Sequence, residues 1–107
     1  TVSVKKYSGG TTFGGGYMTP SPGYDSFLPS LLADPTDYQP VLGFGAEYIY
    51  VKKWDTTAVD WIQYGGRVNY WLSFGAPIIA YGPSGKVIVA WHEDINSNKN
   101  IYVKMQQ

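Results

Sequence analysis

The sequence predicts an all-β fold, and three observations support that prediction. Its 107 residues include 13 Gly, 7 Pro, 10 Tyr and 4 Trp, a composition rich in turn formers and strand formers. The apolar segments are short and bounded by turn residues, and none shows helical periodicity. A strand-like sequence also recurs along the chain, which indicates a repeated β unit.

The recurring strand is clearest at Glu47 to Asp55, and related sequences stand at Thr1 to Ser8 and at Asn100 to Met105. An offset of 47 residues, as from Val4 to Val51, aligns most of the repeated segments. They are Val4-Lys5-Lys6 with Val51-Lys52-Lys53, Ser26-Phe27 with Ser73-Phe74, Leu31-Leu32-Ala33 with Ile78-Ile79-Ala80, and Phe44 with Trp91.

Nearer the carboxyl end the offset becomes 52 residues, as from Ile49 to Ile101. An insertion of five residues within Asp94 to Asn100, at a hairpin tip, explains the change. A solvent-facing turn lengthens at little cost, whereas a strand that slips by one residue inverts its two faces. The pattern predicts a single domain, residues 1–107, with repeats at approximately 26–72 and 73–107 and N-terminal strands within 1–25.

Each unit is expected to contain four antiparallel strands joined by short turns. Pro83-Ser84-Gly85 and Asn96-Ser97-Asn98 have the composition of hairpin tips. The amino end adds a strand from Val2 to Tyr7 and a weak, Gly-rich one around Phe13. The other expected strands are Leu28 to Ala33, Gln39 to Ala46, Tyr48 to Trp54, Val59 to Tyr64, Pro77 to Tyr81, Lys86 to Glu93 and Ile101 to Met105.

The expected strands are apolar on both faces, as in Val87-Ile88-Val89-Ala90-Trp91, so each sheet is predicted to lie between two neighbours. Propeller blades stack in this way, and so do sandwiches with a covered outer face. The fold class is therefore predicted as two four-stranded antiparallel, propeller-like blades, with a β-sandwich as the alternative.

A resemblance to a known family favours the propeller-like blades over the sandwich. Four segments resemble the blades of secreted bacterial β-propeller repeat proteins. They are the run from Ile49 to Asp55, Trp61-Ile62-Gln63-Tyr64-Gly65-Gly66, the segment from Gly85 to Trp91, and an Asn-rich turn into Ile101-Tyr102-Val103-Lys104. The resemblance implies an extracellular protein. The sialidase Asp box, Ser-x-Asp-x-Gly-x-Thr-Trp, is missing from the sequence, so the resemblance implies no glycoside cleavage.

Propellers close with about four to eight blades, and this chain supplies roughly two. A pair of blades alone exposes apolar faces and open edges, so homo-oligomerisation is expected. The chain is similar in size to small two-blade lectins, which implies a trimer with six blades. The third strand occurs three times and the other apolar strands twice, so either one end is exchanged with the next subunit or the chain is cut from a longer array.

Charge and composition exclude several partners. Eight basic residues balance eight acidic ones, so there is no field to attract nucleic acid. The sequence has no cysteine, which excludes disulfides and thiolate chemistry. Its apolar runs are too short to span a bilayer.

The aromatic surplus is the strongest functional signal, because sugar rings lie flat on Trp or Tyr while polar side chains bind their hydroxyls. Trp61 and Trp71 are expected to be exposed, whereas Trp54 and Trp91 match Tyr7 and Phe44 across the repeat, as core positions do. The candidate glycan-binding residues are Trp61, Trp71, Tyr64, Arg67, Trp54, Trp91 and Glu93, with Asp94 as a further polar partner.

Other candidate chemistry is weaker. Asp94, Asn96, Asn98 and Asn100 have the alternation that begins an EF-hand loop, but Lys99 and Met105 replace its Gly and its Glu, so a plain hairpin is favoured over a Ca²⁺ site and no cofactor is expected. His92 is the only histidine and is interpreted as a strand-end residue. Asp55 and Asp60 are interpreted as turn carboxylates rather than a glycosidase pair.

These observations predict a non-enzymatic, multivalent, lectin-like protein whose repeated weak sites bind glycans by avidity. The alternative is a structural or adhesive subunit of an extracellular filament, fibre or viral surface assembly. A propeller fragment without a ligand is the third hypothesis, and an enzyme the last.

Overall fold

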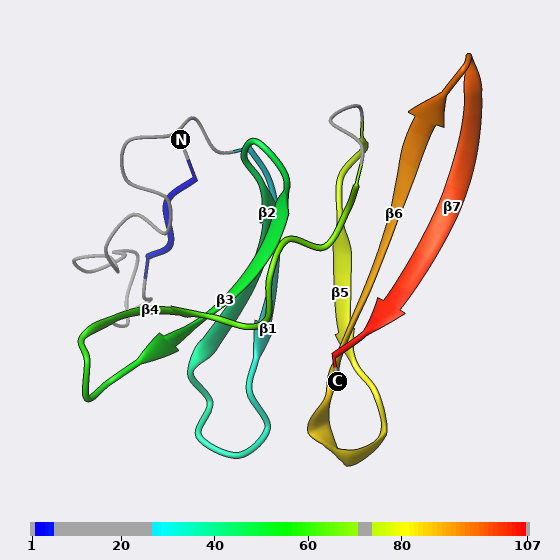
Figure 1. The fold of residues 1–107 in the computed structure, drawn as a ribbon. Coiled ribbons are helices and arrows are strands. Elements are labelled where there is room, and N and C mark those ends of the chain that lie inside the picture. Colours follow the sequence, from blue (N-terminus) through cyan, green and yellow to red (C-terminus); the bar gives the residue numbers. More distant parts are fainter. Residues whose placement is uncertain (1, 6–26, 71–73, 107) are drawn as a thin grey trace, which may run out of the picture.

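The computed structural model describes residues 2–5, 27–70 and 74–106, and this part of the chain is all-β, as predicted. It forms two antiparallel sheets (Figure 1). The first has the strand order β1 (Phe27–Ala33), β2 (Pro40–Gly45), β3 (Ile49–Asp55) and β4 (Asp60–Gln63). The second has the order β5 (Ile78–Tyr81), β6 (Val87–Ile95) and β7 (Asn98–Met105), with a 3-10 turn, η1 (Pro83–Gly85), between β5 and β6.

Turn chemistry explains where the strands end. Asp34 follows β1, and its carboxylate accepts a hydrogen bond from the Thr36 backbone N–H at 2.8 Å, which closes an Asx turn. At the β6–β7 tip, Asn96 and Ser97 both have positive φ, at 49° and 65°, the geometry of a two-residue hairpin whose twist matches that of its strands.

The expected strands occur in the structure with small changes at their ends. The largest change is in β7, which begins at Asn98 rather than Ile101 because the tight turn keeps the strands paired up to the tip. Residues 2–5 are not in a strand, so the expected N-terminal strand is not present there. The rest of that strand and the one around Phe13 lie outside the described residues.

The two central hairpins share one pairing register. When 47 is added to the number of each β2 residue and 52 to that of its β3 partner, every cross-strand pair between β2 and β3 becomes a pair between β6 and β7. For example, Gly43↔Val51 becomes Ala90↔Val103. The other four are Val41↔Lys53 with Ile88↔Met105, Leu42↔Lys52 with Val89↔Lys104, Phe44↔Tyr50 with Trp91↔Tyr102, and Gly45↔Ile49 with His92↔Ile101.

The side chains repeat as well as the backbone. Lys52 lies 6.0 Å from the centre of the Phe44 ring, and Lys104 lies 5.9 Å from the ring of Trp91, its repeat partner. The first strands differ, because β1 pairs Leu31 with Leu42 whereas β5 pairs Ile79 with Val89. The alignment of Leu31-Leu32-Ala33 with Ile78-Ile79-Ala80 is therefore wrong by one residue, and the turn before β6 accounts for the shift.

Both sheets stack in the same direction. We define the front of a sheet as the face that carries Val41, Gly43, Ile49 and Val51, or their repeat partners, and the back as the opposite face. The front of the first sheet packs on the back of the second. Their shared core consists of Val41, Ile49, Val51, Ile79, Val87, Val89 and Trp91. Gly43 permits this contact, because a Cβ there would lie only 2.7 Å from Ile79 Cγ2.

A second core lies on the back of the first sheet, where Val2 and Val4 cover it. The N-terminal residues, the first sheet and the second sheet are therefore three successive layers (Figure 1). This second core consists of Val2, Val4, Leu42, Phe44, Trp54 and Trp61. Two sheets packed face to face fit the β-sandwich that was the alternative prediction.

Candidate functional site

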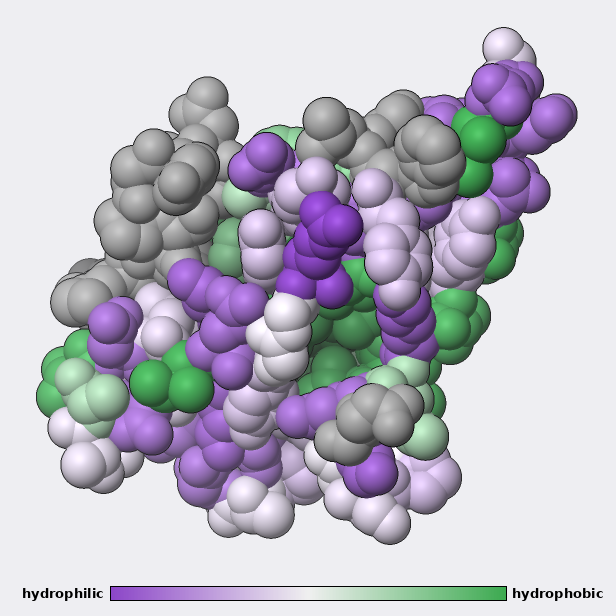
Figure 2. All heavy atoms as spheres, in the orientation of Figure 1, coloured by the Kyte–Doolittle hydropathy of each residue, from purple (hydrophilic) through white to green (hydrophobic). Residues whose placement is uncertain are grey.

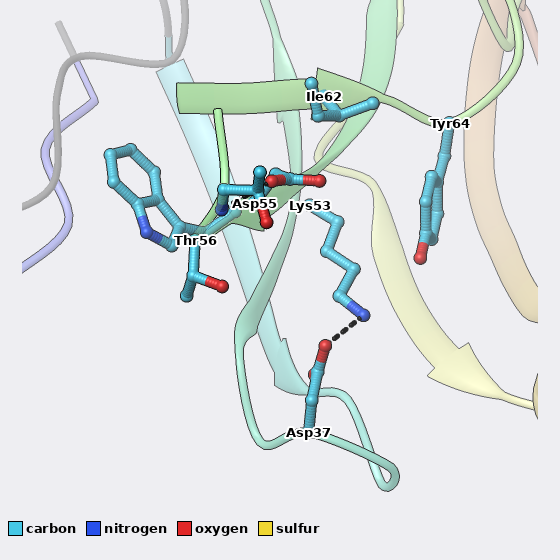
Figure 3. Close-up of a pocket in the computed structure, with 8 residues that line it drawn as sticks. Asp37, Lys53, Asp55, Thr56, Ile62 and Tyr64 are labelled. Atoms are coloured by element: carbon cyan, nitrogen blue, oxygen red, sulfur yellow. Dashed lines mark hydrogen bonds and ion pairs between the residues drawn. The ribbon is translucent and has the colours of Figure 1, made fainter. Parts of the chain in front are cut away.

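The candidate site is a polar pocket of 340 Å³ at the end of the first sheet, where β3 turns into β4 and the β1–β2 loop comes alongside. Figure 3 shows Lys53 reaching from β3 toward Asp37 in that loop, with Thr56 on one side of Lys53 and the Tyr64 ring on the other. The residues that line it are Asp37, Lys53, Trp54, Asp55, Thr56, Thr57, Ile62 and Tyr64.

Lys53 organises this pocket. Its Nζ donates to Asp34 Oδ2 at 2.8 Å and pairs with Asp37 Oδ2 at 2.7 Å. Burial alone lowers the pKa of Lys53, but the hydrogen bonds to Asp34 and Asp37 outweigh burial and hold that pKa above the ordinary lysine range. The ammonium group is therefore charged at neutral pH, and it ties the loop to β3.

The two carboxylates respond in the opposite sense. The hydrogen bond from Lys53, followed by those from Thr36, holds the pKa of Asp34 well below its usual value. Lys53 likewise lowers the pKa of Asp37, and the backbone N–H of Gln39 adds to the effect. Nearby, burial and then the charge of Asp34 raise the pKa of Tyr81 to about 12.

Asp55 is the second acidic group in the pocket. Its Oδ1 accepts hydrogen bonds from the backbone N–H groups of Thr57 and Ala58, both at 2.8 Å, which fixes the β3–β4 turn. Within the described residues its Oδ2 has no hydrogen-bond partner, so that oxygen remains available to a ligand. Asp60 lies directly opposite Asp55 in the register, and its Oδ1 accepts from the Trp61 N–H at 2.7 Å. Both carboxylates thus serve the turn, as the sequence indicated.

A second hollow of 280 Å³ lies between the sheets, and Tyr64 borders it as well as the polar pocket. Arg67 also lines this hollow, and its guanidinium carbon stands 4.3 Å from the centre of the Tyr48 ring. The predicted residues Tyr64 and Arg67 are thus neighbours of one opening. The rest of the lining is mainly apolar and includes Val51, Val68, Val87, Val89 and Met105.

The expected exposure of Trp61 is wrong, because Trp61 is only 6% exposed. It lies opposite Trp54 on the back of the first sheet, with the rings edge to face at 5.5 Å and Val2 and Val4 over them. Trp54 and Trp91 are also buried, as expected of core positions, although Trp54 still borders the polar pocket. Trp71 lies outside the described residues.

Glu93 is held inside the structure rather than presented to a ligand. It is 2% exposed, and its Oε1 accepts from Trp91 Nε1 at 3.0 Å and from the Tyr70 N–H at 3.3 Å. This buried carboxylate anchors the segment that follows β4 to the second sheet. The predicted residues that the structure describes therefore fall into separate places, and Trp54, Tyr64 and Arg67 are the ones that line these two hollows.

Sequence reasoning missed Asp37, Lys53, Thr56 and Thr57. They come from the β1–β2 loop, from β3 and from the β3–β4 turn, and only the pairing of β1 through β4 brings them together. A usable signal was present in the Asp-Pro-Thr-Asp run from Asp34 to Asp37, since closely spaced carboxylates beside a turn often hold a neighbouring lysine.

The Asn-rich segment forms a plain hairpin, which was the favoured interpretation. Asp94 pairs with Lys99 and Ile95 with Asn98, so Asn98 and Asn100 share one face while Asp94 lies on the other. The alternating side chains do not converge. Among the described residues no cluster of three or more His, Asp or Glu side chains is placed to hold a metal ion.

His92 lies beside Asp94, with Nδ1 3.8 Å from Oδ1. A Cβ on Gly75 would overlap its imidazole ring, so Gly75 permits the close packing there.

No family model matches the chain, and no curated protein or solved structure matches it either. Over residues 2–5, 27–70 and 74–106 no helix has the length and apolar character needed to cross a membrane.

Proposed function

We propose that the protein is a non-enzymatic, lectin-like carbohydrate-binding protein that acts outside the cell, with its site in the polar pocket. The observation that carries the proposal is the juxtaposition of the Tyr64 ring with ionised and hydroxyl side chains around 340 Å³ of open space. A single hexose ring needs that combination of a flat apolar surface and hydrogen-bonding groups.

The pocket suits a neutral sugar. Asp37 and Asp55 offer carboxylate oxygens that accept from hydroxyl groups, and Lys53 has a third ammonium hydrogen beyond the two directed to Asp34 and Asp37. Two carboxylates against one ammonium leave the lining net negative. An acidic sugar would be repelled. Single-site affinity is expected to be low because the pocket is open, so avidity from a homo-oligomer, with a trimer favoured, would supply useful binding.

A glycan array followed by calorimetry tests the proposal. Tyr64→Ala removes the stacking surface and should weaken binding of the best neutral glycan about tenfold. Tyr70→Ala is the matched control, because Tyr70 is 68% exposed and does not line the pocket. An array that stays silent at high protein density would refute the proposal, and so would equal losses in the two variants.

The second candidate is a structural or adhesive subunit of an extracellular filament, fibre or viral surface assembly. A specific observation favours it: the front of the second sheet is exposed and apolar, with Ile101 76% and Val103 64% exposed. Electron microscopy separates the two candidates. Long polymers together with a silent array support the structural subunit, whereas discrete particles that bind glycans support the lectin.

A further inference from the structure

The front of the second sheet is an exposed surface that no other described part of the chain covers. Figure 2 shows hydrophobic atoms along the outer side of β7, at the right of the molecule. Ile78 is 67% exposed and Met105 is 50% exposed, values unlike those of the buried core residues. The register places the apolar members of this face side by side. They are Ile78, Ile88, Ala90, Ile101, Val103 and Met105.

The same positions are buried in the first sheet. Ile49 and Val51, the repeat partners of Ile101 and Val103, are 0% and 3% exposed. The back of the second sheet covers them. The second sheet therefore carries the residues of a stacking face without a sheet on top of it, and monomeric proteins seldom expose contiguous apolar surface of this kind.

The direction of stacking shows what should cover this face. Val2 and Val4 align with the front residues Ile49 and Val51 across the repeat, and although residues 2–5 are not in a strand, these valines pack on the back of the first sheet. The front of the first sheet packs in turn on the back of the second. Front meets back at both contacts within the chain. A third contact of the same kind needs another back face, and residues 2–5, 27–70 and 74–106 place none against the front of the second sheet.

We infer that a second copy of this chain docks head to tail on the front of the second sheet, through its own N-terminal side. On that side the described residues Ser3 and Lys5 are exposed, and they alternate with the buried Val2 and Val4. Head-to-tail contacts use two different surfaces, so they either close into a ring or continue into a fibre. The inference holds for both proposed functions and depends on neither.

Charge on the front tests the contact. The double variant Ile101→Lys/Val103→Lys places two ammonium groups in the apolar face, and sedimentation should show a loss of at least tenfold in association. Both side chains are exposed in the single chain, so circular dichroism should show an unchanged fold. Val59→Lys is the control, because Val59 is 60% exposed but lies between β3 and β4, away from this face. A wild-type protein that sediments as an 11.9 kDa monomer at high concentration would overturn the inference.

Cross-linking tests the polarity, and the natural chain has no cysteine to interfere. Chains carrying Ser3→Cys and Val103→Cys are mixed at low concentration with a bismaleimide. We expect covalent dimers that contain one chain of each kind, and little product from either variant alone. If Val103→Cys alone gives the dimer, the contact is front to front and the head-to-tail inference is wrong. Glycan binding of the Ile101→Lys/Val103→Lys variant, measured by calorimetry, reports on the pocket independently.

Discussion

At the scale of single residues, Lys53 has the largest effect on the candidate site. It is one of eight basic residues, and nothing in its local sequence distinguishes it from Lys52. Strand alternation directs the two side chains to opposite faces. Lys52 lies over the Phe44 ring on the back, whereas Lys53 on the front reaches the two aspartates of the β1–β2 loop.

Lys53→Met should destabilise the protein by about 1–3 kcal/mol at neutral pH, because Asp34 is left buried without its charged partner. The measurement is urea unfolding followed by Trp fluorescence. Lys99→Met is the control, since Lys99 is exposed at the β6–β7 tip and should change the free energy of unfolding far less. Equal effects of the two variants would contradict the role assigned to Lys53.

The ion pair of Asp34 and Lys53 also predicts how stability depends on pH. The folded-state pKa of Asp34 is lowered, so its contribution to stability is present above the unfolded value near 3.9 and is lost as the pH falls through the folded value. The folded-state pKa of Lys53 is raised, so its contribution is lost only as the pH rises through that value, above about 10.4. The difference in unfolding free energy between wild type and Lys53→Met should therefore be constant from about pH 5 to 9 and shrink below pH 4.

At the scale of secondary-structure elements, the two central hairpins differ mainly in the length of their tips. The first closes Gly45 on Ile49 through three residues, whereas the second continues pairing from His92↔Ile101 out to Ile95↔Asn98. The sequence predicted this extra length as an insertion of five residues, because the repeat offset is 47 before the β6–β7 tip and 52 after it. It did not show that the inserted residues would pair, since Asn-rich segments serve equally well as open loops.

Replacing the six residues from Asp94 to Lys99 by Asn-Gly should change stability by less than about 1 kcal/mol. The change removes whole cross-strand pairs from an exposed tip and leaves Glu93↔Asn100 to be closed by a two-residue turn. Chemical unfolding and circular dichroism provide the measurement.

Deleting Glu47 from the first hairpin is the matched comparison. Ala46 and Tyr48 would then have to form a two-residue turn that needs positive φ, so this variant should lose about 1–3 kcal/mol. If shortening the β6–β7 tip lowers the free energy of unfolding as much as the Glu47 deletion does, the inserted residues stabilise the sheet rather than merely extend it.

At the scale of the whole molecule, three layers follow one another with the same polarity. The first sheet is the central layer and has a core on each face, which explains why its strands are apolar on both sides. The front of the second sheet is also apolar, but no other described residues pack over it.

Val2→Ala/Val4→Ala should lower the free energy of unfolding by about 3 kcal/mol, since four buried methyl groups contribute about 0.8 kcal/mol each. Both valines belong to the buried cluster that contains Trp54 and Trp61, so the native fluorescence should also shift to the red. Ser3→Ala is the control because Ser3 is exposed. An unchanged emission spectrum and unfolding midpoint in the double variant would show that residues 2–5 do not stabilise the first sheet.

Between Phe27 and Met105 the sequence by itself determined the strands and their turns, because alternation and turn residues are local properties that each segment carries. It did not determine the candidate site, which joins Asp37, Lys53 and Tyr64 from three segments. It also misplaced Trp61, because a tryptophan has the same identity whether it faces solvent or two valines. Only the tertiary structure decides which face of a sheet is covered, since burial depends on what packs against a strand and not on the strand's own residues.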